Sequence, residues 1–487
     1  MVPDEVIRKN KVLLINPPTG ICFRDGRCQG SIEHLTAQPE RIPLELAYMA
    51  AIFETRGYQC RIRDFPMENS SWKDLEQEIE EFFPDILVLS VGSPTVDFDL
   101  KACQIARKIN PRITTVAKGA HLYVFDEQIL GKYPDLDIVI RGEVELTTDD
   151  LANEKPLDEI AGITFRKETE IVRNPDRKLE TDLDRLPFPA RHLLKNDLYV
   201  RPDTKQPLTV IMTGRGCPYN CIFCLAGKLS EFRLTQRSPG RIADEIEACV
   251  SRYNIRNFFF QADTFTINKR WTIQVCREII SRNLNIEWGT NSRVDTIDAE
   301  RLSWMKKAGC YIIGFGVESG NQKTLDRSGK RITLEQSRTA VKLCRQFGIK
   351  TYLLFMIGFP WEDKTMVRQT IRFARELKGD FADFNVAYPY PGTDMYETCL
   401  ARGLFNIEDL CGHDISRPML RTEHLSRKQL NRLRKEAILR FYLRGGYIVR
   451  TLKSIHSLPV MINYLKKGCR MILKLLIPPG RGENEQL

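Results

Sequence analysis

The sequence contains 487 residues, more than one ordinary domain holds, and therefore predicts two or three domains. Hydrophobic residues make up 42% and charged residues 28%, which excludes collagen-like, low-complexity and wholly disordered chains. Fourteen dispersed cysteines do not fit a secreted disulfide scaffold. We find no signal-peptide pattern at the start and no uninterrupted run of 18 apolar residues, so we expect a cytoplasmic protein.

The net charge of +10 is concentrated at one end of the chain. Residues 421–487 contain 15 Lys and Arg against 4 Asp and Glu, whereas the other 420 residues contain 58 basic and 59 acidic side chains. A basic segment of this kind is either a solvated surface or a surface that docks on nucleic acid or anionic lipid.

Short β-branched runs and amphipathic helical patterns alternate through residues 1–150. The predicted strands are Lys11–Asn16, Gln59–Asp64, Ile86–Val91, Thr114–Ala117 and Ile138–Arg141. The predicted helices are Leu44–Thr55, Trp72–Phe83, Lys101–Ile109 and Asp126–Lys132. This order predicts an α/β domain with a doubly wound, Rossmann-like parallel sheet. Such sheets bind ligands at the carboxyl ends of their strands.

A connector, a second alternation and a helical extension follow. Residues 151–204 form a connector with a small hairpin at Gly162–Arg173, and residues 205–420 form the second domain. Its predicted strands are Thr209–Thr213, Asn257–Gln261, Glu287–Asn291, Tyr311–Val317, Thr351–Ile357 and Asp383–Ala387. Six such units predict a (β/α)6 partial TIM barrel with its chemistry at the C-terminal rim. Residues 421–487 form a basic helical C-terminal extension, with a helix over 427–443 that the following GGY interrupts.

One cysteine motif outweighs every other signal. The segment GRGCPYNCIFCLAGK places Cys217, Cys221 and Cys224 in a CxxxCxxC arrangement directly after the first barrel strand. Iron–sulfur cubanes take thiolate ligands, and three of them leave one iron open to another ligand. Zinc is the alternative, but it prefers CxxC pairs and a fourth protein ligand.

This cysteine spacing, with Phe223 before the last cysteine, resembles the signature of the radical SAM superfamily. The resemblance continues through FFFQADTFTINKRW, WGTNSRVDTID, MKKAGCYIIGFGVESG, LLFMIGFPWE and YPYPGTDMY, and so covers most of residues 205–400. It implies that the three cysteines hold a 4Fe–4S cluster. It also implies a set of residues that bind S-adenosylmethionine: Gln261, Asp263, Asn291, Arg293, Glu318, Ile357 and Gly358.

The first 150 residues resemble the cobalamin-binding domain of one subgroup of that family, through INPP, PDILVLSV, AKGAH and IRGEVE in order. AKGAH departs from the usual GGxH form and RGEVE from RGEGE, and each loss of a glycine adds a side chain where cobalamin is expected to approach. No DxHxxG motif supplies a cobalt ligand, and His121 is either a pocket residue or a loop residue that bonds to backbone. The resemblance implies a cobalamin site made of Asn16, Pro17, Ser90, Thr95, Gly119, His121, Gly142 and Glu143.

Together these resemblances imply an enzyme that reductively cleaves S-adenosylmethionine to a 5′-deoxyadenosyl radical and functionalises an unactivated carbon. We expect methyl transfer through cobalamin, with cyclisation or rearrangement of a tetrapyrrole or lipid-like substrate as the alternative. The substrate is a small or lipid-like molecule, and a reductant such as flavodoxin or ferredoxin supplies electrons. A tRNA methylthiotransferase is a further alternative, but no compact β-rich RNA-binding domain ends the chain, so a nucleic-acid partner is not expected. A non-enzymatic sensor leaves the S-adenosylmethionine motifs unexplained.

Two weaker signals remain. Cys411, in LCGHD, is a candidate hydrogen donor to the substrate. Cys249, Cys276, Cys310 and Cys344 are expected in the core, and none of the dispersed cysteines forms the CxxC pairs of an auxiliary cluster, so we predict a single cluster. Aliphatic and aromatic residues alternate with Lys and Arg in the C-terminal extension, which is either a cap over the barrel or a peripheral membrane anchor.

Overall fold

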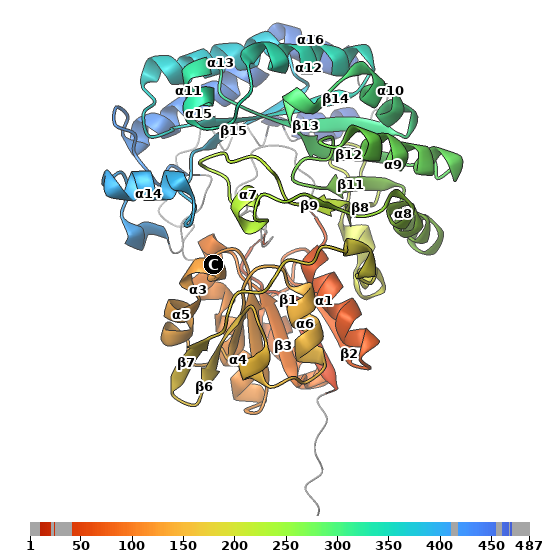
Figure 1. The fold of residues 1–487 in the computed structure, drawn as a ribbon, viewed down its shortest axis with the longest axis vertical. Coiled ribbons are helices and arrows are strands. Elements are labelled where there is room, and N and C mark those ends of the chain that lie inside the picture. The colour runs from red at the N-terminus through yellow and green to blue at the C-terminus, as the bar shows by residue number, and fades with distance from the viewer. Residues whose placement is uncertain are drawn as a thin grey trace, which may run out of the picture.

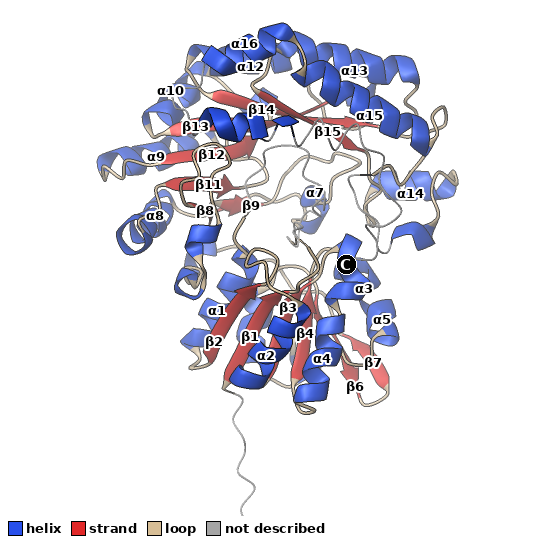
Figure 2. Cartoon of the chain, turned by 180° about the vertical axis from the view of Figure 1, so that it is seen from behind, coloured by secondary structure: helices blue, strands red, loops and turns tan. Residues whose placement is uncertain are grey.

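The computed structural model describes residues 10–20, 24, 41–410, 417–453, 460–466 and 468–469. Two sheets dominate it (Figure 1), one near each end of the molecule, and the short helix α7 (Ala226–Leu229) lies between them. Figure 2 shows the same two layers from behind, with the helices of the second sheet forming an outer arc. The predicted fold class is confirmed.

The N-terminal sheet has seven strands in the order β2-β1-β3-β4-β5-β6-β7. The first five are parallel: β1 (Lys11–Asn16), β2 (Gln59–Asp64), β3 (Ile86–Ser90), β4 (Thr114–Lys118) and β5 (Ile138–Ile140). The predicted hairpin forms as β6 (Ile163–Lys167) and β7 (Glu170–Arg173), and it adds an antiparallel edge to this sheet. The hairpin thus belongs to the first sheet rather than standing apart within a connector.

Both faces of this sheet are buried, as expected for a doubly wound fold. Along β1, Val12 and Leu14 join one hydrophobic cluster while Leu13 and Ile15 join the other. The first cluster lies under α1 (Leu44–Thr55) and α6 (Glu145–Ala152), and the second lies under α2 (Trp72–Phe82), α4 (Lys101–Ile109) and α5 (Leu122–Lys132). Helix α5 begins four residues before its predicted start at Asp126, and Phe125 departs from helical dihedrals within it.

The second sheet is parallel and runs in the order β15-β14-β13-β12-β11-β8. Its strands are β8 (Leu208–Met212), β11 (Asn257–Gln261), β12 (Glu287–Ser292), β13 (Cys310–Glu318), β14 (Lys350–Ile357) and β15 (Phe381–Val386). Its outer face packs on α8 (Pro239–Tyr253), α9 (Lys269–Ser281), α10 (Ala299–Lys307), α12 (Leu334–Gln346) and α13 (Lys364–Leu377). Every strand predicted in the two sheets is confirmed within two residues of its ends.

Local capping fixes where several barrel helices start. At α12 the Thr333 hydroxyl accepts from the Gln336 amide at 3.2 Å, and the Gln336 side chain accepts from the Thr333 amide at 2.8 Å. This capping box satisfies backbone donors that the first turn of a helix leaves open. Because the first turn of α12 is held in this way, the loop before it is also held in place, and this loop carries Lys330.

The C-terminal extension packs on the barrel as α15 (Arg427–Tyr442) and α16 (Gly445–Lys453). The predicted helix over 427–443 is confirmed, and it ends at Tyr442, before the glycines as expected; the glycines themselves begin the separate helix α16. Among the residues described, no helix is long and apolar enough to span a bilayer.

Candidate functional site

The three motif cysteines follow β9 (Gly214–Arg215) in the loop that leads into α7. Burial raises the pKa of the Cys217 and Cys221 thiols and raises that of Cys224 to about 12. The three thiols are close enough together that the charge of one affects the pKa of another. Within the described ranges, no three His, Cys, Asp or Glu side chains converge on a single metal ion. A cubane binds each thiolate at a different iron, so spaced thiols on one loop fit a cluster better than a single ion.

A tight backbone contact fixes the start of the cysteine loop. Gly216 has φ +90°, and a Cβ there would lie 1.9 Å from the Arg233 carbonyl oxygen, so only glycine fits. The Gly216 amide donates to Oδ2 of Asp263 at 2.7 Å. This bond ties the predicted S-adenosylmethionine residue Asp263, after β11, to the root of the loop.

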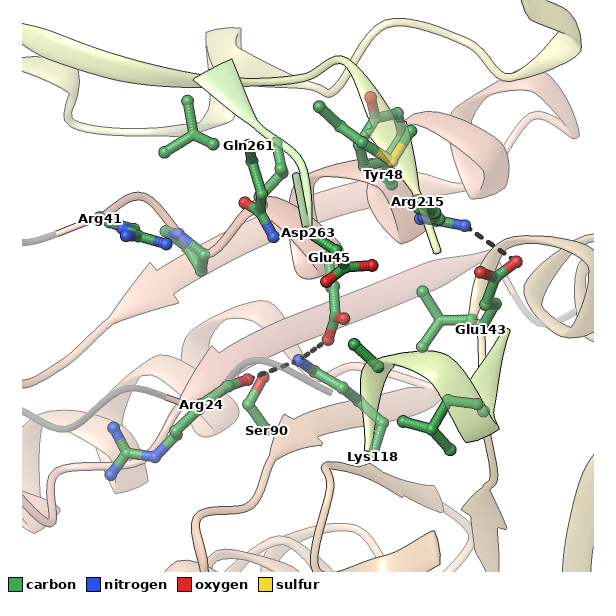
Figure 3. Close-up of a pocket in the computed structure, with 18 of the residues that line it drawn as sticks. Arg24, Arg41, Glu45, Tyr48, Ser90, Lys118, Glu143, Arg215, Gln261 and Asp263 are labelled. Atoms are coloured by element: carbon green, nitrogen blue, oxygen red, sulfur yellow. Dashed lines mark hydrogen bonds and ion pairs between the residues drawn. The ribbon is translucent and has the colours of Figure 1, made fainter. Parts of the chain in front are cut away.

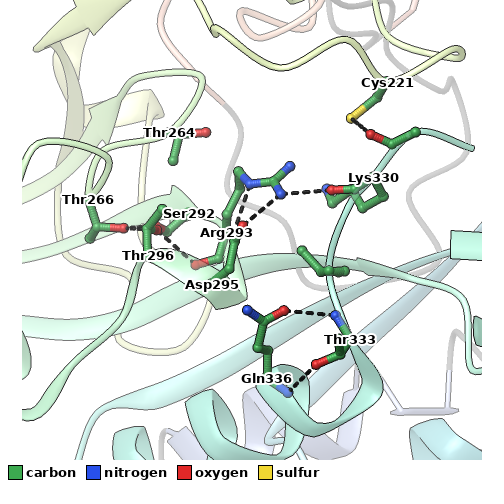
Figure 4. Close-up of polar contacts among 12 residues, drawn as sticks. Cys221, Thr264, Thr266, Ser292, Arg293, Asp295, Thr296, Lys330, Thr333 and Gln336 are labelled. Atoms are coloured by element: carbon green, nitrogen blue, oxygen red, sulfur yellow. Dashed lines mark hydrogen bonds and ion pairs between the residues drawn. The ribbon is translucent and has the colours of Figure 1, made fainter. Parts of the chain in front are cut away.

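A second group of charges lies beside the same loop (Figure 4). Arg293 donates to both oxygens of Asp295 at 2.9 Å and to the Lys330 carbonyl oxygen at 2.8 Å, and its guanidinium lies 3.6 Å from the centre of the Tyr219 ring. Lys330 in turn donates to Oε1 of Glu318 at 2.8 Å. The electrostatic influence of these charges reaches the cysteine thiols. Lys330 escaped sequence analysis because it stands in a loop outside every recognised motif.

Glu318 adopts φ +62° at the end of β13, a left-handed conformation that is rare for a side-chain-bearing residue. It is buried and holds its ion pair with Lys330 in that conformation. Such backbone outliers concentrate at functional sites, where the surrounding structure over-determines them.

Ile357 and Gly358, at the end of β14, are the last two residues predicted to bind S-adenosylmethionine, and they differ in their contacts. The Ile357 side chain is fully buried in the hydrophobic core of the barrel, and its carbonyl oxygen accepts from the Ala387 amide at 2.8 Å. The amide of Gly358 donates to Oε2 of Glu362 at 2.7 Å. Sequence analysis did not select Glu362, whose burial raises its pKa to about 7.

A cavity of about 450 Å³ separates the two sheets (Figure 3). Its lining includes Cys224 and three of the predicted S-adenosylmethionine residues, and four of the predicted cobalamin residues. These are Gln261, Asp263 and Asn291 from the barrel, and Asn16, Ser90, Gly142 and Glu143 from the N-terminal sheet. The carboxyl edges of both sheets therefore meet at one cavity, as the rule for open α/β sheets predicts.

The other predicted cobalamin residues do not line this cavity: Pro17, Thr95, Gly119 and His121. His121 is buried, contacts the Ser93 hydroxyl through Nδ1 at 3.0 Å and packs on Phe125. Burial lowers its pKa to about 4, so the ring is neutral at pH 7. Cys411, Cys22 and Cys28 lie outside the described residues.

Lys118, the residue that departs from the GGxH pattern, reaches into the cavity (Figure 3). Its ammonium pairs with Oε2 of Glu45 and donates to the Arg24 carbonyl oxygen at 3.0 Å. The extra side chain therefore adds a partly buried ion pair to the wall that the N-terminal sheet contributes to the cavity. Lys118 could be noticed from the sequence because it departs from the GGxH pattern, whereas no sequence feature pointed to Glu45.

Arg215 links the two sheets across the cavity. Its Nη1 lies 3.1 Å from Oε2 of Glu143, and its two terminal nitrogens both donate to the Glu145 carboxylate. Arg215 stands two residues before Cys217, and the two glutamates follow β5. One guanidinium thus joins the root of the cysteine loop to the edge of the N-terminal sheet.

Comparisons with known proteins agree with this geometry. The B12 binding domain model matches residues 34–152, and the Radical SAM superfamily model matches residues 211–374. An uncharacterized methyltransferase of Pyrococcus horikoshii is 32% identical over 96% of this chain and 98% of its own. The anaerobic magnesium-protoporphyrin IX monomethyl ester cyclase of Rubrivivax gelatinosus is 29% identical over 73% of this chain and 66% of its own.

The fold matches a solved structure of the same architecture. The radical S-adenosylmethionine methyltransferase TsrM of Kitasatospora setae, solved with cobalamin and a 4Fe–4S cluster, superimposes with a TM-score of 0.66 at 18% identity. The match covers 81% of this chain and 78% of that one. The chain therefore belongs to the B12-binding radical SAM enzymes, whose cofactors are a 4Fe–4S cluster, S-adenosylmethionine and cobalamin.

Proposed function

We propose that this enzyme transfers a methyl group to an unactivated carbon of a small organic molecule, with cobalamin as the methyl carrier. The observation that supports this most directly is the cavity shared by both carboxyl edges, which Cys224 lines from the barrel and Ser90 and Gly142 line from the N-terminal sheet. A reaction that uses both cofactors on one substrate needs such a shared space.

In this proposal the three cysteines would hold the cluster, and the polar residues around them would orient S-adenosylmethionine. Asp263 is positioned by the Gly216 amide, while Arg293 and Glu318 are positioned by Asp295 and Lys330. When bound, the cofactors supply the reductive cleavage and the methyl group. The chain supplies orientation, because Lys118, Glu45 and Arg215 are already paired in the cavity wall.

Partners and location are part of the proposal. The substrate class is a small or lipid-like molecule, and a one-electron donor such as flavodoxin or ferredoxin would reduce the cluster. We keep the cytoplasm as the expected location. A radical cyclisation is the second candidate, because the Rubrivivax relative is a cyclase by name.

The test uses anaerobically purified full-length protein reconstituted with iron, sulfide and cobalamin. We expect one four-iron cluster and one cobalamin per chain, and formation of both 5′-deoxyadenosine and S-adenosylhomocysteine from S-adenosylmethionine. Formation of 5′-deoxyadenosine without S-adenosylhomocysteine would favour the cyclase. Two clusters without cobalt would contradict the cobalamin assignment.

A further inference from the structure

Helix α16 presents aliphatic side chains to solvent. Tyr447 is buried against α15, whereas Ile448, Val449 and Leu452 are 44%, 53% and 52% exposed. On the surface helix of a globular protein the apolar stripe normally faces the core. Here one apolar stripe, at positions i, i+1 and i+4, faces outward.

The next described segment continues this surface. Residues 460–466 are held to the barrel by Tyr464, which stacks on Phe381, and by Asn463, which donates to the Asp203 carbonyl oxygen at 3.2 Å. Two further aliphatic side chains of the segment point outward, Ile462 at 41% and Leu465 at 57% exposure. We call the five residues the docking face: Ile448, Val449, Leu452, Ile462 and Leu465.

The docking face lies at the end of the barrel opposite the cofactor cavity. Arg450 of α16 donates to the carbonyl oxygen of Gly379, two residues before β15, at 2.7 Å, and Asp203 precedes β8. These contacts are at the amino ends of the strands, whereas the cavity lies at their carboxyl ends. Figures 1 and 2 show α16 at the end of the molecule away from the N-terminal sheet. A partner on this face would leave the cavity open.

The sequence segment that carries the docking face is strongly basic, although Asp203 and Asp380 of the barrel lie near Tyr464. Residues 437–482 contain nine Lys and Arg and no Asp or Glu. Exposed aliphatic side chains beside clustered cations are typical of helices that lie in the interface of an anionic bilayer. Two copies of this face would instead bring two basic segments together.

We propose that the docking face binds the surface of an anionic phospholipid bilayer. The aliphatic side chains enter the headgroup boundary while the basic residues contact lipid phosphates. The protein is then peripheral, with its cofactor cavity directed away from the lipid.

The experiment is vesicle flotation of the full-length reconstituted protein. One set of vesicles contains phosphatidylcholine alone, and the other contains about 30% phosphatidylglycerol as well. We expect binding to the anionic set only, weakened by added KCl. The triple variant Ile448→Asn, Val449→Asn, Leu452→Asn should bind about tenfold less. The matched control is Leu400→Asn, Ile407→Asn, which changes exposed aliphatic residues outside the docking face and should bind as the unmodified protein does.

Equal binding to neutral and anionic vesicles, or unchanged binding by the triple variant, would overturn the proposal. So would a dimer in solution that the triple variant dissociates, together with no vesicle binding, because the occupant would then be a second copy. The dependence on lipid charge and salt uses the unmodified chain, so the outcome does not depend on how the variant folds. Cleavage of S-adenosylmethionine without vesicles tests the proposed function separately and should be the same in all three proteins.

Discussion

Charged side chains are paired and largely buried at the carboxyl ends of the barrel strands. The amino ends also carry a largely buried pair, Arg201 with Asp203, but differ in a cluster of exposed aliphatic side chains. Arg215 with Glu145 and Lys330 with Glu318 illustrate the first end, and Ile448 with Val449 the second. Burying a charge is costly unless a partner compensates it, so each of these cations is held by a carboxylate. Exposed aliphatic side chains cost little singly, but a cluster of them marks a contact surface. The buried charges at the carboxyl ends suit the proposed polar cofactors, and the exposed aliphatic side chains at the amino ends suit the proposed lipid surface.

The largest effect should follow from removing a cluster ligand. We expect Cys217→Ala to lower reductive cleavage of S-adenosylmethionine by about a thousandfold or more, because the cluster loses one of its three anchors. Iron content and 5′-deoxyadenosine formation measure this. The matched control is Cys344→Ala, which removes a thiol buried in the hydrophobic core of the barrel. Equal iron loss in both variants would contradict a specific role for Cys217.

The next effect tests the buried pairs at the carboxyl end. Arg215→Gln leaves Glu143 and Glu145 without the guanidinium that joins them to the cysteine loop. We expect product formation to fall by about 10- to 100-fold, as for other residues that orient a cofactor's ligands. The direct measurement is the magnetic interaction between the reduced cluster and cob(II)alamin, which reports their separation without a substrate. It should be sharply defined in the unmodified enzyme and broadened in the variant.

Arg215→Lys keeps the charge but not the bidentate geometry. Its product formation should lie between that of the unmodified enzyme and that of Arg215→Gln. The control is Lys195→Gln, which breaks the 2.6 Å pair between an exposed lysine of the connector and Glu68 of the N-terminal domain. An unchanged interaction in Arg215→Gln, with both cofactors fully loaded, would contradict the positioning role.

The sequence predicted the strands and the cysteine loop because both depend on local signals. Apolar runs such as β1 and the spacing of Cys217, Cys221 and Cys224 are complete within a few residues. The pairs that form the cavity wall are not local: Lys118 and Glu45 are 73 residues apart, and Arg215 and Glu145 are 70 apart. No periodicity encodes such contacts. The antiparallel edge formed by β6 was missed for the same reason, since its pairing with β5 depends on the folded sheet.

A smaller effect should follow from adding a side chain at Gly119, just after the carboxyl end of β4. A Cβ at Gly119 would lie 2.2 Å from the Val91 carbonyl oxygen, at φ +154°. We expect Gly119→Ala to destabilise this domain by about 2–3 kcal/mol and to weaken cobalamin retention. Thermal unfolding and cobalt content after gel filtration measure both. Gly131→Ala is the control, because its Cβ would meet only Ile171 Cδ1 at an ordinary 3.8 Å. Equal stability of the two variants would contradict the expected clash.

The smallest effect concerns His121, a buried titratable group that differs from the ion pairs because it is neutral at pH 7. Burial lowers its pKa to about 4, and the opposing attraction of Asp97 is weaker. An unfolded histidine titrates near its ordinary value of about 6.5, so between these values the unfolded chain binds the extra proton. The contribution of neutral His121 to the free energy of unfolding is therefore fully present above about pH 6.5. It is lost as the pH falls toward 4, by about 2 kcal/mol at pH 5.

His121→Asn removes this proton uptake, so its thermal midpoint should fall less than that of the unmodified protein when the pH is lowered from about 7 to about 5. Other titrating groups act on both proteins, and the difference between the two pH profiles isolates His121. The same pH dependence in both would show that His121 is not held neutral.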